Sequence, residues 1–326
     1  MILVTGSSGH LGEALMRHGR AQGRVMRGLD RVAAPWTDVV GDIADAGTVR
    51  AAMDGVRAVI HTATLHKPHV ATHTPQAFVD TNISGTLALL QAAAEARVDG
   101  FVFTSTTSAF GRALSPAPGQ PAAWIDETVG SVPKNIYGAT KTGAEDLCQL
   151  YAVQERLPLL VLRVARFFPE PDDDPDKRAA YPDDNAKANE FLFRRLDLED
   201  ACAAHLLAVD QAARIGFDRL ILSAPSPFQR ADLAELRHAA PAVAARYVPD
   251  MPEIYARLGW RMFAGIDRVY DSRRAQNVLG WRPRYGFETV LRQAAAHDPI
   301  GSALSRDVGI KGYHGAHYAD GLYPVC

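Results

Sequence analysis

The chain has 326 residues, enough for one large domain or two smaller ones. Its 47% apolar and 22% charged content is ordinary for a globular enzyme, and its formal net charge of −2 argues against nucleic acid or an anionic membrane as partner. The cysteines Cys148, Cys202 and Cys326 offer neither a disulfide framework nor zinc-ligand spacing. No apolar run approaches the roughly 20 residues of a membrane span. The first expected strand begins at residue 2, which leaves no room for a cleaved signal peptide, so we expect a cytoplasmic protein.

Short apolar runs and helical stretches alternate through the first half of the chain. This alternation predicts an α/β fold with a parallel, doubly wound Rossmann sheet and with sites at the carboxyl ends of the strands. The expected strands are 2–4, 24–29, 39–43, 58–62, 101–104 and 159–164, and the expected helices begin at Leu11 or span 46–53, 83–96 and 137–156.

The pattern changes after residue 164. Residues 167–184 are rich in Pro and Asp, and we expect them to lack regular structure. A helix over 198–212 and a strand over 219–223 are expected to return to the sheet. We therefore predict a dinucleotide-binding domain over 1–165 and a smaller, irregular substrate-binding domain over 166–326, whose tail from residue 298 has no predicted structure.

Three glycines, Gly6, Gly9 and Gly12, follow the first expected strand and open a helix. Backbone N–H groups at a helix N-terminus, together with the helix dipole, favour a phosphate or pyrophosphate. Asp30 ends the second expected strand, where the fingerprint places an acid about 20 residues on. A carboxylate there accepts the hydroxyls of an adenosine ribose and repels a 2′-phosphate, a repulsion that Arg31 could soften in part. We therefore expect NAD rather than NADP, with a solvated turn as the alternative for Asp30 and Arg31.

Tyr137 and Lys141 are four residues apart, so a helix places them on one face, one turn apart. An ammonium group beside a phenol is expected to lower the tyrosine pKa from its usual value near 10. Such a tyrosine can act as general acid or base on an alcohol or ketone, whereas a surface pair is the alternative. The hydroxyl-rich run 104–108 ends the fifth expected strand, where one hydroxyl is expected to hold the same substrate oxygen and the others to cap the backbone.

Taken together, these segments resemble the extended short-chain dehydrogenases/reductases of the NAD-dependent sugar epimerase/dehydratase family. The resemblance covers roughly residues 1 to 290. The matching segments are Thr5–Gly12, Gly28–Arg31, Gly41–Ile43, Val59–Ala63, Asn82–Thr86, Thr104–Gly111, Tyr137–Lys141, Asp197–Asp200 and Asp271–Pro283.

The resemblance implies a role for each matching position. Thr106 would be the catalytic hydroxyl, Tyr137 the acid or base, and Asn82 a brace for the central helix. The implied contacts with NAD are Gly6, Gly9, His10 and Leu11 at the pyrophosphate, Asp30 and Arg31 at the adenosine ribose, Asp42 and Ile43 at the adenine, Ala63 along the dinucleotide, and Tyr137 with Lys141 at the nicotinamide end.

Departures from the family pattern narrow the reaction. Thr107 and Ser108 stand where members that eliminate water or carbon dioxide have an extra carboxylate, so both activities lose ground. Arg166 stands where many nucleotide-sugar enzymes have Asn, which makes a bare sugar or another small hydroxy or keto compound an alternative substrate. The residues expected to face the substrate are Thr64, His66, Thr106, Thr107, Arg166, Arg261 and Arg268.

The resulting hypothesis is an NAD-dependent sugar or nucleotide-sugar epimerase that works through a transient keto intermediate. A net dehydrogenase or reductase would use the same residues and release the reduced cofactor. A dinucleotide-sensing protein without turnover is the third possibility, but a sensor has no need of the set Thr106, Tyr137 and Lys141.

Two further expectations concern metals and assembly. The spacing of His66, His69 and His73, and the pair His314 and His317, invites a metal site, but prolines interrupt the first group and we expect no metal. Two of the expected helices have more apolar positions than one sheet face needs, which predicts a homodimer. These positions are Leu89, Leu90, Leu147, Leu150 and Val153.

Overall fold

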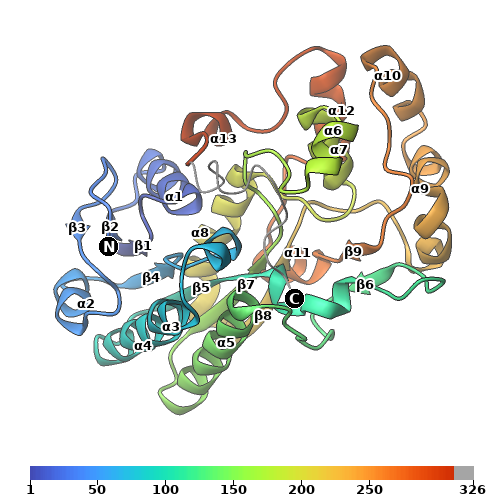
Figure 1. The fold of residues 1–326 in the computed structure, drawn as a ribbon. Coiled ribbons are helices and arrows are strands. Elements are labelled where there is room, and N and C mark those ends of the chain that lie inside the picture. Colours follow the sequence, from blue (N-terminus) through green and yellow to red (C-terminus); the bar gives the residue numbers. More distant parts are fainter. Residues whose placement is uncertain (312–326) are drawn as a thin grey trace.

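A computed structural model describes residues 1–311. Its centre is a seven-stranded, wholly parallel sheet with the order β3-β2-β1-β4-β5-β7-β8, which confirms the predicted doubly wound Rossmann sheet (Figure 1). The strands are β1 (Ile2–Thr5), β2 (Met26–Asp30), β3 (Val39–Val40), β4 (Ala58–His61), β5 (Gly100–Thr106), β7 (Leu159–Val164) and β8 (Phe217–Leu222).

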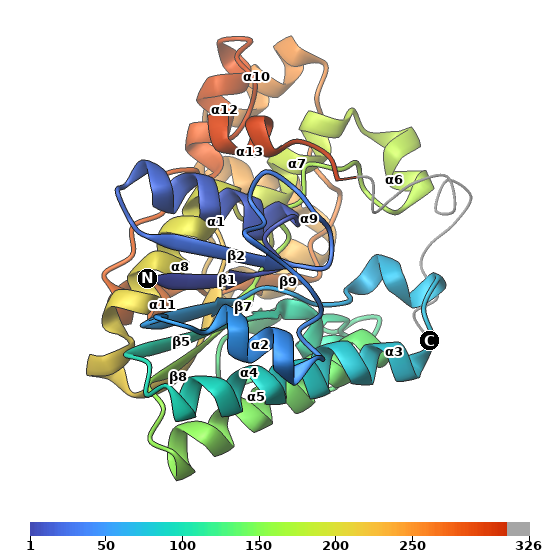
Figure 2. The same ribbon diagram turned by 90° about the vertical axis from the view of Figure 1, so that its left-hand side faces the viewer.

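Helices cover both faces of this sheet (Figure 2). All residues of β1, β4 and β7 are buried, which is why these strands are nearly continuous apolar runs rather than alternating ones. One face packs against α1 (His10–Ala21), α8 (Leu198–Ile215) and α11 (Arg273–Leu279), and the other against α2 (Ala46–Ala52), α4 (Gly85–Glu95) and α5 (Ile136–Gln154).

The helices beside the site begin at capping residues. The side chain of Asn135 accepts a hydrogen bond from the backbone N–H of Gly138 at 3.0 Å and so fixes the first turn of α5. The expected helix over 83–96 is longer than predicted, because α3 (Pro75–Val79) continues through a π-helical turn, η2 (Asp80–Ser84), into α4. Two 3-10 segments, η1 (Lys67–Ala71) and η3 (Thr107–Leu114), follow β4 and β5.

A second hydrophobic core lies in the C-terminal half, beyond the carboxyl ends of the strands (Figure 1). It includes Phe191, Leu236 and Val290, whereas α8 and β8 belong to the main sheet. The boundary at residue 165 stays a prediction. The remaining elements are β6 (Ala123–Ile125) paired with β9 (Arg268–Tyr270), α6 (Pro175–Ala180), α7 (Asp183–Phe191), η4 (Arg230–Asp232), α9 (Leu233–Tyr247), α10 (Met251–Leu258), α12 (Phe287–Ala295) and α13 (Ala303–Val308).

Several expectations are corrected. Residues 167–184 do contain regular structure, because Asp174 caps α6 and Pro175 occupies its first turn. The third strand is only two residues long, and the short pair β6 and β9 was not expected. Part of the tail from residue 298 is helical in α13, which packs against α1 and α8. His314, His317 and Cys326 lie outside the described residues. Within residues 1–311, no helix is long and apolar enough to cross a membrane.

Candidate active site

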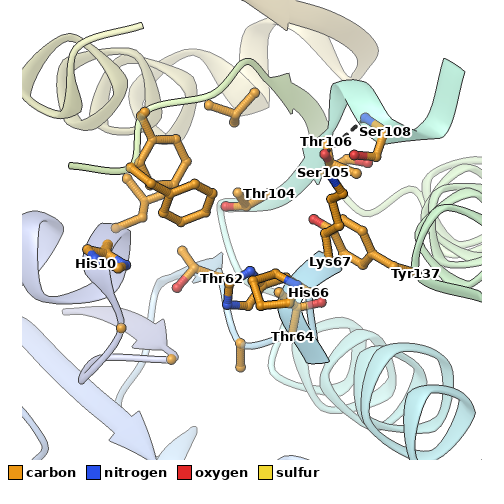
Figure 3. A pocket seen from close by; sticks show the side chains of 18 of the residues that line it. His10, Thr62, Thr64, His66, Lys67, Thr104, Ser105, Thr106, Ser108 and Tyr137 are labelled. Atoms are coloured by element: carbon orange, nitrogen blue, oxygen red, sulfur yellow. Dashed lines mark hydrogen bonds between the residues drawn. The ribbon is translucent and has the colours of Figure 1, made fainter. Parts of the chain in front are cut away.

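The loops that follow β1, β2, β3, β4, β5 and β7 line one cavity of about 790 Å³. It opens at the carboxyl ends of the strands, between the neighbours β1 and β4. From β1 the chain continues to β2 on one side, and from β4 it continues to β5 on the other side, so the strand order reverses here. Such a switch point is where open parallel sheets bind their ligands. Figure 3 shows His10 on one side of this cavity and Tyr137 on the other, with Thr62, Thr64, His66 and Thr104 between them.

The glycine loop after β1 has the shape that a pyrophosphate needs. Gly6 adopts φ +73°, and a Cβ there would lie 2.7 Å from the backbone nitrogen of Ala63. A Cβ on Gly12 would overlap the carbonyl oxygen of Gly6. Gly9 is the N-cap of α1, and Gly9, His10 and Leu11 line the cavity beside Ala63. The first turn of α1 therefore faces the cavity, which is the arrangement that binds phosphate groups.

The end of the cavity beside β2 and β3 is lined by Asp30, Arg31 and Asp42. The two carboxylate oxygens of Asp30 accept the backbone N–H groups of Ser8 and Val32, each at 2.9 Å. Each oxygen has a second lone pair, so a ribose hydroxyl can still be accepted. Ile43 also lines this end. Arg31 lies 3.5 Å from Asp42, and both side chains are largely exposed, so this ion pair adds little stability.

The catalytic candidates meet at the opposite end. Thr106 is the last residue of β5, and its hydroxyl accepts the N–H of Ser108 at 3.0 Å (Figure 3). Tyr137, in the first turn of α5, lines the same part of the cavity and is 8% exposed. Burial raises the pKa of Tyr137 to about 12, although a side-chain hydrogen bond with Thr106 opposes the rise. The geometry places two hydroxyls where one substrate oxygen could meet both.

The pKa of Tyr137 is raised rather than lowered, and Lys141 is not among the causes of its shift, so that expectation is wrong. The ammonium group of Lys141 donates to the carbonyl oxygen of Thr104 at 2.7 Å and lies 3.9 Å from the centre of the Phe103 ring. Burial lowers the pKa of Lys141 to about 7, while the charges of Cys148 and Glu145 oppose the shift. The lysine is buried against β5 rather than exposed in the cavity.

Asn82 braces the helix that presents Tyr137. Its amide nitrogen donates to the carbonyl oxygen of Leu65 at 2.9 Å and to the hydroxyl of Thr140 at 3.0 Å. Its amide oxygen accepts the hydroxyl of Thr64 at 2.9 Å. The loop after β4 and the first turns of α5 are therefore held together by one buried side chain.

The substrate side contains most of the expected residues. Thr64, His66, Thr107, Arg166 and Arg268 all line the cavity, and Thr64 and His66 lie between His10 and Tyr137 (Figure 3). The ring of His66 stacks on Phe168 with ring centres 5.5 Å apart. Within residues 1–311, no group of three or more His, Cys, Asp or Glu side chains could hold a metal ion.

Arg261 does not reach the cavity. Its guanidinium donates to the carbonyl oxygen of Ala180 and lies 4.9 Å from the centre of the Tyr181 ring. Four further residues line the cavity that the sequence did not single out, namely Lys67, Phe167, Phe168 and Arg194.

Arg166 and Arg194 belong to a network of buried charges. Arg166 lies 3.6 Å from Asp172, and Arg194 lies 3.5 Å from the same carboxylate and contacts Glu190. Burial opposes ionisation of Glu190, but the surrounding guanidinium groups hold its pKa well below its usual range. The carboxylates therefore hold both guanidinium groups in place and neutralise part of their charge.

Comparison with known proteins identifies the chain as an NAD-dependent epimerase or oxidoreductase. Residues 2–215 match the NAD dependent epimerase/dehydratase family, and the chain belongs to that family. NAD is accordingly its cofactor, in agreement with the glycine loop and Asp30.

The relatives of this chain include epimerases and dehydrogenases. The chain is 29% identical over 290 residues to a UDP-glucose 4-epimerase of Rhizobium leguminosarum bv. trifolii, covering 78% of this chain and 81% of that one. It is 31% identical over 175 residues to a UDP-glucose 4-epimerase of Rhizobium meliloti (strain 1021), a match that spans half of each protein. An NAD-dependent glucose-6-phosphate dehydrogenase of Haloferax volcanii is 31% identical over 183 residues, or 50% of this chain and 67% of that one.

The same fold occurs in solved structures. A short-chain dehydrogenase/reductase superfamily protein of Agrobacterium tumefaciens, crystallised with bound NAD, superposes with a TM-score of 0.66 at 24% identity. The match covers 91% of this chain and 96% of the other. At this identity the likeness supports the fold alone.

Proposed function

We propose that this enzyme epimerises a sugar or nucleotide sugar by oxidising one hydroxyl to a ketone and then reducing the ketone on its other face. The observation that supports this most directly is the Thr106–Tyr137 pair on the rim between the glycine loop and the basic end of the cavity. A secondary alcohol on that rim would face an acid/base group and a cofactor at once.

The residues of the chain have distinct tasks in this proposal. NAD, when bound, supplies a hydride acceptor and a positive charge in the cavity. Tyr137 removes the hydroxyl proton as the alcohol is oxidised and returns it as the ketone is reduced. Thr106 holds the reacting oxygen. Because burial raises the pKa of Tyr137 to about 12, the tyrosine needs a cation beside it to act as a base near neutral pH.

The other end of the cavity favours an anionic substrate. In the described part of the chain, basic side chains line the cavity, and carboxylates pair with several of them. Asp172 pairs with Arg166 and Arg194, and Asp173 pairs with Lys67. The diphosphate of a nucleotide sugar would match that field. The basic residues are Lys67, Lys134, Arg166, Arg194 and Arg268.

A second candidate is the net oxidation of a sugar phosphate. The cavity has Arg166 and Phe167 after β7, where many nucleotide-sugar enzymes have Asn and its neighbours, and the same basic residues would bind a phosphate monoester. The Haloferax relative is an NAD-dependent glucose-6-phosphate dehydrogenase. This reaction would use the same Tyr137 and Thr106 but would need stoichiometric NAD.

Incubation of the purified enzyme with UDP-glucose, with other UDP-sugars and with glucose 6-phosphate tests both candidates. The expected result is formation of an epimer, detected by NMR, without added NAD in proportion to product. Accumulation of reduced nicotinamide with an oxidised product would replace the first candidate with the second. Turnover of no member of the panel would contradict both proposals, provided that the protein binds NAD.

A further inference from the structure

Residues 166–174, which we term the latch, line part of the cavity and contact both the glycine loop, at His10, and the loop after β4, at Lys67. In the middle of the latch lies Glu170, whose Oε1 is 2.8 Å from Nε2 of His10. The two side chains are 2% and 1% exposed. His10 is the first residue of α1, at the position where a pyrophosphate would meet the helix.

The same carboxylate anchors the C-terminal segment. Oε1 of Glu170 accepts the backbone N–H of Lys311 at 3.1 Å, and the ammonium of Lys311 contacts Glu13, one turn along α1 from His10. Burial opposes ionisation of Glu170, but the hydrogen bonds from His10 and Lys311 outweigh burial and hold its pKa below the usual range. Glu170 is therefore a buried anion that joins three segments far apart in the sequence.

The latch is also attached on the far side of the cavity. Asp173 lies 3.2 Å from the ammonium of Lys67 in the loop after β4. The Phe168 ring stacks on His66 and meets the ring of His10 edge-on at 5.3 Å between centres. Arg166, Phe167 and Phe168 line the same cavity as the glycine loop. A dinucleotide that extends from the glycine loop to Tyr137 would lie beneath the latch.

We propose that Glu170 is a positioning residue that fixes His10 in the glycine loop and holds the latch closed over NAD, so that the cofactor stays bound between turnovers. The inference rests on the proposed function only in taking NAD as the ligand. Beyond the proposed function, it assigns retention of the cofactor to the buried pair of His10 and Glu170. An enzyme that returns the hydride to its substrate gains from this device, because its cofactor is regenerated without leaving.

The test is the rate at which NAD dissociates from Glu170→Gln, measured by loading the protein with radiolabelled NAD, adding excess unlabelled NAD and counting the bound label after rapid filtration at successive times. Gln keeps the size of the side chain but removes the charge. The dissociation rate should rise on the order of tenfold or more, the scale of one charged hydrogen bond. Glu253→Gln, an exposed acid-to-amide change on α10, is the matched control and should dissociate NAD like wild type.

A second variant covers the possibility that Glu170→Gln does not fold. Glu170→Asp keeps the charge but is one methylene shorter. NAD should dissociate from it faster than from wild type and more slowly than from Glu170→Gln. If Glu170→Gln unfolds, the faster dissociation from Glu170→Asp than from wild type is the test. A folded Glu170 variant with a lower melting temperature and an unchanged NAD dissociation rate would show a structural role alone and would overturn the proposal. Wild-type protein that fails to bind NAD would overturn the proposed function as well, so the two failures are distinguishable.

Discussion

The ammonium group of Lys141 donates a hydrogen bond to the carbonyl oxygen of Thr104, 2.7 Å away, and not to the tyrosine one helical turn before it. This contact ties α5 to the end of β5, where Thr106 lies. It also buries a titratable group whose pKa falls to about 7, while burial raises the pKa of Tyr137 to about 12. Tyr137 and Lys141 are therefore both neutral between about pH 7 and pH 12. A cation in the cavity would lower the pKa of a tyrosine that starts out protonated.

The first prediction concerns Lys141 and stability. The folded state binds the lysine proton less tightly than the unfolded state, whose pKa is near 10.5, so between pH 7 and 10.5 the unfolded chain holds more protons. The difference in unfolding free energy between wild type and Lys141→Met should therefore change in favour of wild type as the pH rises across this window. The total change should be on the order of a few kcal/mol. Urea titrations of both proteins at several pH values measure it. Parallel pH profiles would contradict the burial of an ionisable lysine.

The second prediction concerns Tyr137→Phe. Loss of the hydroxyl should lower kcat on the order of 10²–10⁴-fold, because the acid/base group is removed while the ring still packs beside Phe78. The melting temperature and the NAD dissociation constant should change little. Tyr151→Phe, on the same helix but outside the cavity, is the matched control. Near-wild-type turnover by Tyr137→Phe would refute its catalytic assignment.

The sequence was most informative where local chemistry is decisive. Gly6 lies in a turn, Asp30 ends β2 and Tyr137 lies in the first turn of α5, as expected, because each of these features depends on nearby residues alone; their roles stay predictions. The latch was not predicted, because the pairing of His10 with Glu170 joins residues far apart in the chain. The short strands β6 and β9 are too brief to show a periodicity.

The prolines and aspartates of residues 167–184 were misinterpreted for a physical reason. Asp174 accepts the N–H groups of Asp176 and Lys177, and Pro175 has a backbone angle suited to the first turn of a helix. Both residue types interrupt helices internally but begin them well, so composition alone suggested a loop where α6 forms. Arg261 was expected to face the substrate, but its guanidinium group donates to the carbonyl oxygen of Ala180 and does not reach the cavity.

The third prediction concerns cofactor choice. Wild type should prefer NAD, because a 2′-phosphate would lie beside the Asp30 carboxylate. Asp30→Asn keeps an acceptor for the N–H of Ser8 but removes the charge, so it should narrow the NAD-to-NADP preference by roughly tenfold. Fluorescence titration of each cofactor measures this preference. Equal binding of NAD and NADP by wild type would contradict the assignment of Asp30.

The fourth prediction concerns assembly. Leu89 and Leu90 are buried against the sheet and cannot form an interface, which corrects part of the expectation. Leu150 and Val153, one turn apart on α5, are 44% and 70% exposed, so the prediction of a homodimer now depends on this helix. In an isologous contact each substitution acts twice, so Leu150→Glu should give folded monomers at micromolar concentration.

Light scattering with a melting curve measures both the mass and the folding of this variant. Val25→Glu is the matched control, since Val25 is an apolar residue that is 67% exposed and lies in the turn between α1 and β2, away from α5. Val25→Glu should remain dimeric. A wild-type protein that is a folded monomer at high concentration would refute the homodimer.

The central claim is that hydride leaves the substrate and returns to it within one cavity. The most direct measurement follows a substrate with deuterium at the carbon that is oxidised, with UDP-glucose labelled at its C4 position as the first choice. We predict that the epimer keeps the deuterium at that carbon, by NMR and mass spectrometry, and that no free reduced nicotinamide accumulates in the absorbance spectrum. Loss of the deuterium to solvent, or reduced nicotinamide released in proportion to product, would contradict internal hydride return.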